Sequence, residues 1–353
     1  MKFFATLLLL ALAAAGLGAW LVYAPFGPAQ DSAAANANPI YVDIAPGSGT
    51  QSIAAQLQNS GAIRSRYAFF ILRALKGGTL KAGEYRFDHP APATEVYARI
   101  VRGDVYTVAV TIPEGFNIFD IADAIDKAGL APRDKFLAAE RNDTALINDL
   151  SPHAASLEGY LFPDTYRFPH HVTPEKILST MVRRFRAVAT QLGISPANAD
   201  GVAHSSRSDE WGSNQLDLPQ KIVLASLVER EVSQDSERPM VAGVFVNRLA
   251  HNMPLATDPS IIYAALLNHR WRGTIYASDL KFDSPYNTYT HTGLPPGPIC
   301  NPGMAALKAA ITPAHTDYLY FVADGEGHSV FSATLAQHNQ HVAAWRSATH
   351  HTP

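Results

Sequence analysis

The amino-acid sequence predicts an α+β protein that follows a single transmembrane helix. The chain has 353 residues, of which 47% are hydrophobic, and this is enough for two or three folded units with their own cores. Residues 3–23 form an uncharged, apolar run. After this run, strand patterns and helix patterns follow one another and are separated by turns that contain glycine and proline.

Charge and cysteine content exclude several classes of protein. The formal net charge of -3 gives no general attraction to nucleic acid. The single cysteine, Cys300, excludes a disulfide framework and a cysteine-based metal site, and we expect a buried thiol. The fourteen histidines include no HExxH motif or comparable ligand spacing. The sequence therefore predicts neither a metal site nor a cofactor.

The N-terminal run has the length of a membrane span. Residues 3–23 carry no charge, and about 20 helical residues cross a hydrocarbon core of about 30 Å. The run is longer than the signal-peptide core of about 7 to 15 residues, which favours a retained anchor, although the small residues at 32–39 permit cleavage. Lys2 precedes the span, and no Lys or Arg occurs between Ala24 and Ile63. This asymmetry predicts that most of the chain lies outside the cytoplasm.

Changes in composition predict the domain boundaries. Residues 1–23 are the predicted anchor, and residues 24–38 are a linker of small, proline and polar residues that cannot bury enough surface to fold. Two later segments, 40–63 and 108–130, resemble each other: each predicts a strand, a glycine turn and an apolar-striped helix that ends at glycine. The predicted folded units are 39–105, a second α/β segment at 106–155, and a third, larger unit at 156–345.

The unit at 39–105 is similar, in degenerate form, to the small βααβ carbohydrate-binding module called LysM. A predicted strand at 80–87 and a predicted helix at 95–103 follow the first strand–turn–helix segment. The alternative is a structural α+β platform that touches no sugar, and the sequence does not separate the two.

The segment SLEGYLFPDTYRF, residues 156–168, places two acids among aromatic residues. Glu158 and Asp164 alternate with Tyr160, Phe162 and other rings. Flat aromatic faces beside carboxylates are typical of a saccharide groove. An aromatic core turn with solvated acids is the alternative.

The segment KIVLASLVEREV, residues 221–232, places two glutamates at the end of an apolar run. A helix with Pro219 in its first turn puts the small Ala225 and Ser226 one turn before Glu229. Glu231 then points in nearly the opposite direction. Burial of Glu229 against apolar walls would disfavour its charged form and keep a proton available, which suits a general acid. The alternative is an exposed helix glutamate.

Later segments predict the rest of the third unit. Residues 237–249 form an amphipathic helix, and in the next segment Asp258 stands before Pro259, so that Asp258 is either a helix cap or a substrate ligand. Residues 284–303 form a loop rich in proline and glycine, and its length without regular structure favours a functional wall. Residues 318–342 predict a strand, a glycine turn, a strand and a helix.

Six segments together resemble the successive motifs of the YceG-like endolytic murein transglycosylases. They are LEGYLFPDTY, ASLVEREV, VFVNRL, TDPSIIYA, SPYNTYTHTGLPPGPICNPG and YLYFVADGEGHSVFSATLAQHN. The resemblance covers residues 156–342 and implies a mixed α/β catalytic domain in which Glu229 is the catalytic acid. The candidates for holding the glycan or the cleft are Glu158, Asp164, Asn247, Asp258, Asn287 and Tyr289. The polar segment 198–218 departs from the family pattern and is interpreted as an insertion.

The resemblance implies a lytic transglycosylase that cleaves the bond between N-acetylmuramic acid and N-acetylglucosamine and leaves a 1,6-anhydro end. The implied partners are peptidoglycan strands, the membrane and peptidoglycan synthases, and the implied location is the bacterial inner membrane with the catalytic domain on the periplasmic side. A glycan hydrolase would need a second carboxylate, for which Glu158 and Asp258 are candidates. A non-catalytic peptidoglycan-binding scaffold is the third interpretation.

Overall fold

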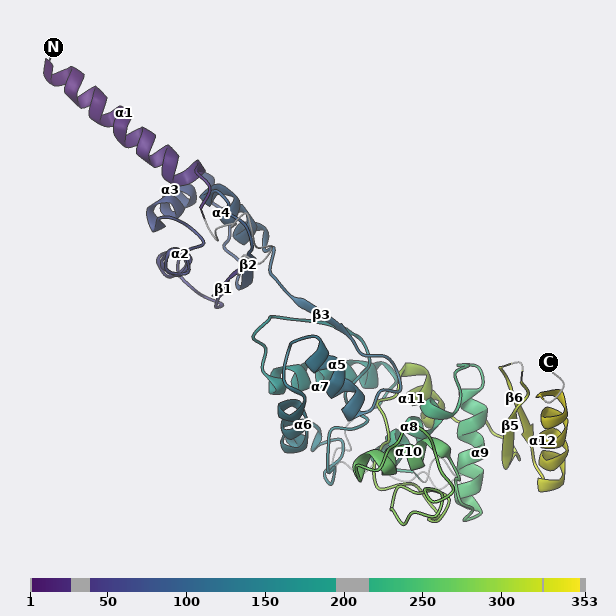
Figure 1. Cartoon of the computed structure of the whole chain (residues 1–353). Coiled ribbons are helices and arrows are strands. Elements are labelled where there is room, and N and C mark those ends of the chain that lie inside the picture. The colour runs from purple at the N-terminus through teal and green to yellow at the C-terminus, as the bar shows by residue number, and fades with distance from the viewer. Residues whose placement is uncertain (1, 27–38, 195–215, 326, 350–353) are drawn as a thin grey trace, which may run out of the picture. The chain divides into compact units, whose positions relative to one another are not determined.

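The computed structural model describes residues 2–26, 39–194, 216–325 and 327–349. The chain divides into two compact units, residues 1–108 with 167–171, and residues 109–166 with 172–353. Both units mix helices with short strands (Figure 1). The predicted insertion at 198–218 lies outside the described residues except for its last three positions, and most of the predicted linker lies outside them as well.

The first unit contains a two-stranded antiparallel sheet covered by helices. Its elements are α1 (Lys2–Tyr23), β1 (Ile40–Ile44), α2 (Thr50–Asn59), α3 (Arg66–Lys76), β2 (Gly83–Phe87) and α4 (Ala93–Arg102). In the sheet, Ile40 pairs with Phe87 and Ile44 with Gly83. The order β1, α2, α3, β2 is the predicted βααβ order, whereas the likeness to a sugar-binding module stays a prediction.

The core of the first unit explains why these segments fold together. Ile53 and Leu57, one turn apart on α2, are buried against Phe69 of α3 and Tyr97 of α4. Phe69 and Tyr97 meet edge to face, with ring centroids 5.1 Å apart. The apolar stripe predicted for α2 is therefore the stripe that fills the core.

Helix α1 has an exposed apolar surface along most of its length, and its C-terminal end packs into the first unit. Residues Phe3–Tyr23 form a helix long and apolar enough to cross a membrane, the one such helix among the described residues, with a mean hydropathy of 2.2. Near its end Val22 is buried in the core of the first unit, and the guanidinium of Arg64 lies 4.2 Å from the Trp20 ring. The last turn of α1 is thus part of the fold of the first unit.

The second unit is mostly helical. Its elements are β3 (Val108–Thr111), α5 (Ile118–Lys127), α6 (Arg133–Asn142), the 3-10 helix η1 (Thr144–Ile147), β4 (Thr165–Phe168), α7 (Pro174–Gln191), α8 (Leu218–Glu231), α9 (Arg238–Ala250), α10 (Asp258–Leu267), α11 (Met304–Ile311), β5 (Tyr320–Ala323), β6 (Ser329–Ser332) and α12 (Leu335–Thr349). Strand β3 pairs with β4, and β5 pairs with β6. The division between the units runs through β3 and β4.

The internal similarity predicted from the sequence is confirmed. Helices α2 and α5 each have 10 residues and begin at Thr50 and Ile118, the predicted offset. The matched turn glycines Gly47 and Gly115 have φ values of 82° and 77°, a left-handed conformation that favours glycine. The same backbone path therefore leads into both helices.

Helix α8 is the centre of the second unit. Seven consecutive residues, 222–228, are buried, so the helix is apolar on all sides rather than along one stripe. It packs against α9, α10 and α11 (Figure 1). Polar side chains that follow the buried run must therefore emerge at the C-terminal end of α8.

Candidate active site

The N-terminus of α8 is fixed by a capping box. Asp217 accepts a hydrogen bond of 2.9 Å from the backbone N–H of Gln220, and the Gln220 side chain accepts one of 3.0 Å from the N–H of Asp217. Pro219 stands in the first turn, as predicted. These local interactions set the start of the helix and hence the register that brings Glu229 to its last turn.

Ser226, one of the small residues one turn before Glu229, contacts the proline-rich loop at residues 299 and 300. The Ser226 hydroxyl donates to the carbonyl of Val223 at 2.7 Å and accepts from the N–H of Ile299 at 3.1 Å. The Cys300 thiol, which is buried as expected, donates to the carbonyl of Ser226 at 3.3 Å. The proline-rich loop therefore docks on α8 one turn before Glu229 and leads directly into α11.

The Glu229 carboxylate is held by polar partners, whereas the sequence predicted apolar walls. Its side chain is 5% exposed, and Oε2 accepts a hydrogen bond of 2.9 Å from the N–H of Gly303. The same oxygen lies 2.8 Å from Nη1 of Arg238, whose side chain is also 5% exposed. Arg238 is held in turn by Asp235, which accepts from Nε at 3.0 Å. A buried ion pair and the N–H of Gly303, the residue directly before α11, thus position this carboxylate.

A second carboxyl group, Glu114, lines the same pocket. Burial raises the pKa of Glu114, repulsion from Glu229 adds to the shift, and attraction to Arg238 opposes it. Glu114 belongs to the turn after β3, and the next residue, Gly115, donates its N–H to the carbonyl of Asn301 at 3.0 Å. The open pocket has a volume of about 500 Å³, and its lining includes Glu114, Gly115, Glu229, Arg230, Glu231 and Arg238.

Glu231 has surroundings different from those of Glu229. Burial raises the pKa of Glu231 to about 7, with repulsion from Asp258 adding to the shift and attraction to Arg248 opposing it. Its Oε1 is buried and has no hydrogen-bond partner within the described part of the chain. Glu229 and Glu231 thus have different charged neighbours although both line the pocket, and the predicted divergence of their side chains stays a prediction.

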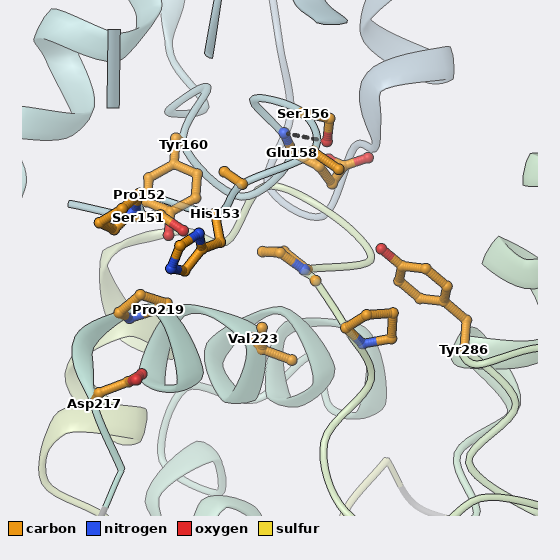
Figure 2. Close-up of a pocket in the computed structure, with 15 residues that line it drawn as sticks. Ser151, Pro152, His153, Ser156, Glu158, Tyr160, Asp217, Pro219, Val223 and Tyr286 are labelled. Carbon is orange, nitrogen blue, oxygen red and sulfur yellow. Dashed lines mark hydrogen bonds between the residues drawn. The ribbon is translucent and has the colours of Figure 1, made fainter. Parts of the chain in front are cut away.

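A second pocket of about 250 Å³ borders the N-terminal half of α8. Figure 2 shows the loop that carries His153 and Tyr160 on one side, Pro219 and Val223 of α8 facing it, and Tyr286 at the other end. Glu158 also lines this pocket, and its backbone N–H donates to the Ser156 hydroxyl at 3.2 Å. Aromatic rings and polar groups therefore flank α8 ahead of the pocket that contains Glu229.

Three of the predicted binding residues are engaged inside the protein. Glu158, which is 1% exposed, accepts hydrogen bonds from the N–H of Ile118 and from Asn301, and burial raises its pKa well above the usual range. Asn247 donates to the carbonyls of Thr316 and Tyr318. Asn287 is fully buried, and its side-chain amide donates to three carbonyls in the segment before it, those of residues 279, 280 and 282. A role in substrate binding stays a prediction for each of them.

The other three predicted binding residues reach the surface. Asp164 is 38% exposed and forms an ion pair of 2.7 Å with Arg184. Tyr289 is 39% exposed, and its hydroxyl donates to Asp258 at 2.7 Å. The structure therefore brings together Asp258 and Tyr289, while their contact with substrate stays a prediction.

In the first unit, Glu84, His170 and His171 offer possible metal-ligand atoms within 4.8 Å of one another, the one such group among the described residues. Glu84 accepts a hydrogen bond of 2.6 Å from the N–H of His170, whose ring stacks on Tyr41. The His171 side chain is 72% exposed. Protein contacts thus account for the placement of Glu84 and His170, and the group carries no metal assignment.

Sequence reasoning missed Glu114, Arg238 and Asn301. Arg238 follows the break between α8 and α9, and Asn301 acts across long sequence separations. For Glu114 the sequence contains one usable signal. When the two matched turns are aligned, Glu114 corresponds to Pro46 of the first unit. A carboxylate at this position distinguishes the second turn from the first.

The fold and the pocket define a mixed α/β protein that gathers carboxyl groups at the end of a buried central helix. The chain belongs to the YceG-like family, whose model matches residues 42–344. It is 33% identical over 318 residues to the endolytic murein transglycosylase of Bacillus subtilis (strain 168), covering 85% of this chain and 83% of that protein.

Two further comparisons agree with this membership. The endolytic murein transglycosylase of Streptococcus pneumoniae serotype 2 (strain D39 / NCTC 7466) is 28% identical over 333 residues, which cover 86% of this chain but 58% of that longer protein. The crystal structure of a YceG-like protein from Listeria monocytogenes aligns with a TM-score of 0.55 and 31% identity, covering 86% of this chain and 99% of that one.

Proposed function

We propose that this protein is an endolytic peptidoglycan lytic transglycosylase with Glu229 as its general acid and base. The observation that carries the proposal is the Glu229 carboxylate, buried at the end of α8, fixed by Arg238 and Gly303, and lining an open pocket. The name of the Bacillus subtilis relative supports the substrate and the reaction class.

A single carboxyl group can complete this reaction. Protonated Glu229 gives its proton to the glycosidic oxygen as the C1–O bond of N-acetylmuramic acid breaks, and the N-acetylglucosamine side leaves as an alcohol. The C6 hydroxyl of the same muramic residue then attacks C1, and the Glu229 carboxylate takes the hydroxyl proton. The proton returns to its starting position, water is not consumed, and a 1,6-anhydro end is formed.

Asp258 and Tyr289 are the proposed contacts for the glycan among the predicted binding residues, because their hydrogen-bonded pair is partly exposed. We assign Glu158, Asn247 and Asn287 to the support of the site, since each is buried and hydrogen-bonded within the protein. Asp164 is exposed and supplies a further candidate contact.

The first unit and α1 fit the same function. Helix α1 would anchor the chain in the inner membrane, and the absence of Lys and Arg between Ala24 and Ile63 favours a periplasmic location for both units. The βααβ order of residues 40–87 supports the proposal of a LysM-like unit that binds glycan. An anchored enzyme of this kind would meet new strands close to peptidoglycan synthases.

Mass spectrometry of purified glycan strands digested by the full chain in detergent tests the proposal. Wild-type protein should cleave within the strands and release fragments that end in 1,6-anhydromuramic acid. The control variant Glu175→Gln, at an exposed position of α7, should do the same. Glu229→Gln should lower the rate at least about 100-fold, because it removes the acid. Reducing ends would identify a hydrolase, and no cleavage by folded wild-type protein would favour a binding scaffold.

A further inference from the structure

Gly303 lies beside both the Glu229 and the Glu114 carboxyl groups. Its N–H donates to Glu229 Oε2 at 2.9 Å. A methyl group on its Cα would overlap the carboxyl group of Glu114. The φ of -76° and ψ of 177° at Gly303 suit any residue, so its backbone conformation does not require glycine. Glycine is required at this position because the Glu114 carboxyl group occupies the space that a side chain would need.

Arg238 is the positive charge that both carboxyl groups share. It forms the ion pair with Glu229, and its attraction also acts on Glu114. Although Nη1 of Arg238 lies 2.8 Å from Glu229, it is a buried donor with no directed hydrogen bond to any described residue. The donors of a guanidinium form a fork, which allows one side chain to face two carboxylates.

The geometry points to a proton-sharing pair in which Glu114 acts as the proton reservoir of Glu229. This inference rests on the proposed function and adds to it a positioning residue that acts through Glu229. With one proton on the pair, one of the two carboxyl groups faces Arg238 as a carboxylate, beside the ion pair that Arg238 forms with Asp235, and repulsion between two ionised groups at Gly303 is avoided.

The proton transfer is balanced within the pocket. In the resting state, Glu114 carries the proton and the Glu229 carboxylate pairs with Arg238. The O–H bond of Glu114 breaks and an O–H bond forms on Glu229, through a water molecule where needed since the pocket is open, and Arg238 then faces the Glu114 carboxylate. Glu229 donates its proton to the leaving oxygen and regains one from the C6 hydroxyl.

Other charged groups around Glu114 modulate this exchange. Asp235, on the connection between α8 and α9, raises the pKa of Glu114 further, after the larger effects of burial, Glu229 and Arg238. Arg230 and Glu231, both on α8, line the same pocket. The Glu114→Gln variant leaves all of these groups in place, so its effect reports on the Glu114 charge itself.

Carboxyl-detected ¹³C NMR of the full chain in detergent tests the pair without requiring activity. The Glu114 signal, assigned by its loss in Glu114→Gln, should titrate in two coupled steps in wild-type protein and in one step in Glu229→Gln. A single step with the same midpoint in both proteins would overturn the proton-sharing pair. Coupled titration without production of anhydro ends would overturn the proposed function and leave the pair standing.

The pH profile of glycan cleavage gives the second readout. Without the negative charge of Glu114, the repulsion that delays loss of the last proton of the pair is absent, and the alkaline limb of kcat/KM should move down by about one pH unit or more. Glu175→Gln should keep the wild-type profile. A uniformly lower rate with an unmoved limb would assign Glu114 a structural role only and overturn the proposal.

Gly303→Ala provides a variant that keeps both carboxyl groups. Its methyl group should displace Glu114 and leave the N–H that Glu229 uses. The alkaline limb should therefore move in the same direction as in Glu114→Gln. If Glu114→Gln does not fold, this variant decides the question, and an unmoved limb in a folded protein would count against the pair.

Discussion

Asn301 donates a hydrogen bond of 2.7 Å from Nδ2 to Oε1 of Glu158, which lies 143 residues away in the sequence. The same Nδ2 reaches the carbonyl of Phe116 at 3.0 Å, and Oδ1 accepts from the N–H groups of Gly159 and Leu161. One buried amide thus joins the turn after β3, the loop that carries Glu158 and the loop before α11. Two of these segments carry Glu114 and Gly303 to the pocket.

Replacement of Asn301 by alanine should therefore destabilise the second unit. The buried N–H groups of Gly159 and Leu161 would lose their acceptor, at a cost of about 1–3 kcal/mol each, and we expect a loss of about 3 kcal/mol in unfolding free energy. Denaturant titration of the full chain in detergent measures it. Asn142→Ala, at an exposed position of α6, is the control. Equal stability of the two variants would contradict the structural role of Asn301.

The local elements of the fold were predictable because short-range patterns determine them. The apolar run of residues 3–23, the matched turns at Gly47 and Gly115, and Pro219 in the first turn of α8 each appear in the structure as expected. Each of these elements is determined locally, by an unbroken apolar run, by a glycine at a turn or by a proline in the first turn of a helix. The mostly apolar run 222–228 was recognised in the sequence, and all seven of its residues are buried in the structure.

The electrostatic partners of the site were not predictable from those patterns. The position of Glu229 followed from the motif, but its contact with Gly303 joins residues 74 positions apart, and Arg238 reaches it from the next helix. Glu158 was a candidate for a saccharide groove, and its burial and its hydrogen bond with Asn301, 143 residues away, had no signal in the sequence. Such contacts depend on tertiary packing, which the spacing of single residues along the chain does not encode.

Glu140 should make stability fall as the pH rises. It is fully buried, Oε1 accepts a hydrogen bond from the N–H of Leu157, Oε2 has no partner in the described residues, and burial raises its pKa from 4.5 to about 7. The folded state therefore binds this proton more tightly than the unfolded state, so the contribution is complete below pH 4.5 and is lost as the pH rises through about 7.

Glu140→Gln should reduce this pH dependence, because the amide has no proton to lose. The part due to Glu140 is at most about 3 kcal/mol, and Glu231, with its pKa also near 7, contributes in the same direction and remains. Unfolding free energies at pH 5 and pH 8 measure the effect. Parallel profiles for the variant and the wild-type protein would show that Glu140 is ionised in the folded state.

Gly243 in α9 should resist replacement by alanine, although alanine is the better helix former by about 1 kcal/mol. An added Cβ would lie 2.5 Å from the carbonyl oxygen of Ala314 and 2.9 Å from Cγ2 of Thr316. The overlap involves backbone, so we expect a net loss of about 1–3 kcal/mol in unfolding free energy. Gly49→Ala is the control, since no atom lies within 4 Å and its φ of -72° suits alanine. A stabilised Gly243→Ala protein would contradict the close contact.

Arg238 should be required for stability because Glu229 is charged and buried beside it. Arg238→Met removes the guanidinium but keeps a long side chain, and breaking one partner of a buried ion pair costs about 3–5 kcal/mol. Adding Glu229→Gln to Arg238→Met removes the carboxylate that the first replacement leaves unpaired. The double variant should therefore be more stable than Arg238→Met alone, although it carries one substitution more. Denaturant midpoints of the wild-type protein and the three variants form the cycle, and additive losses would mean that the two side chains do not interact.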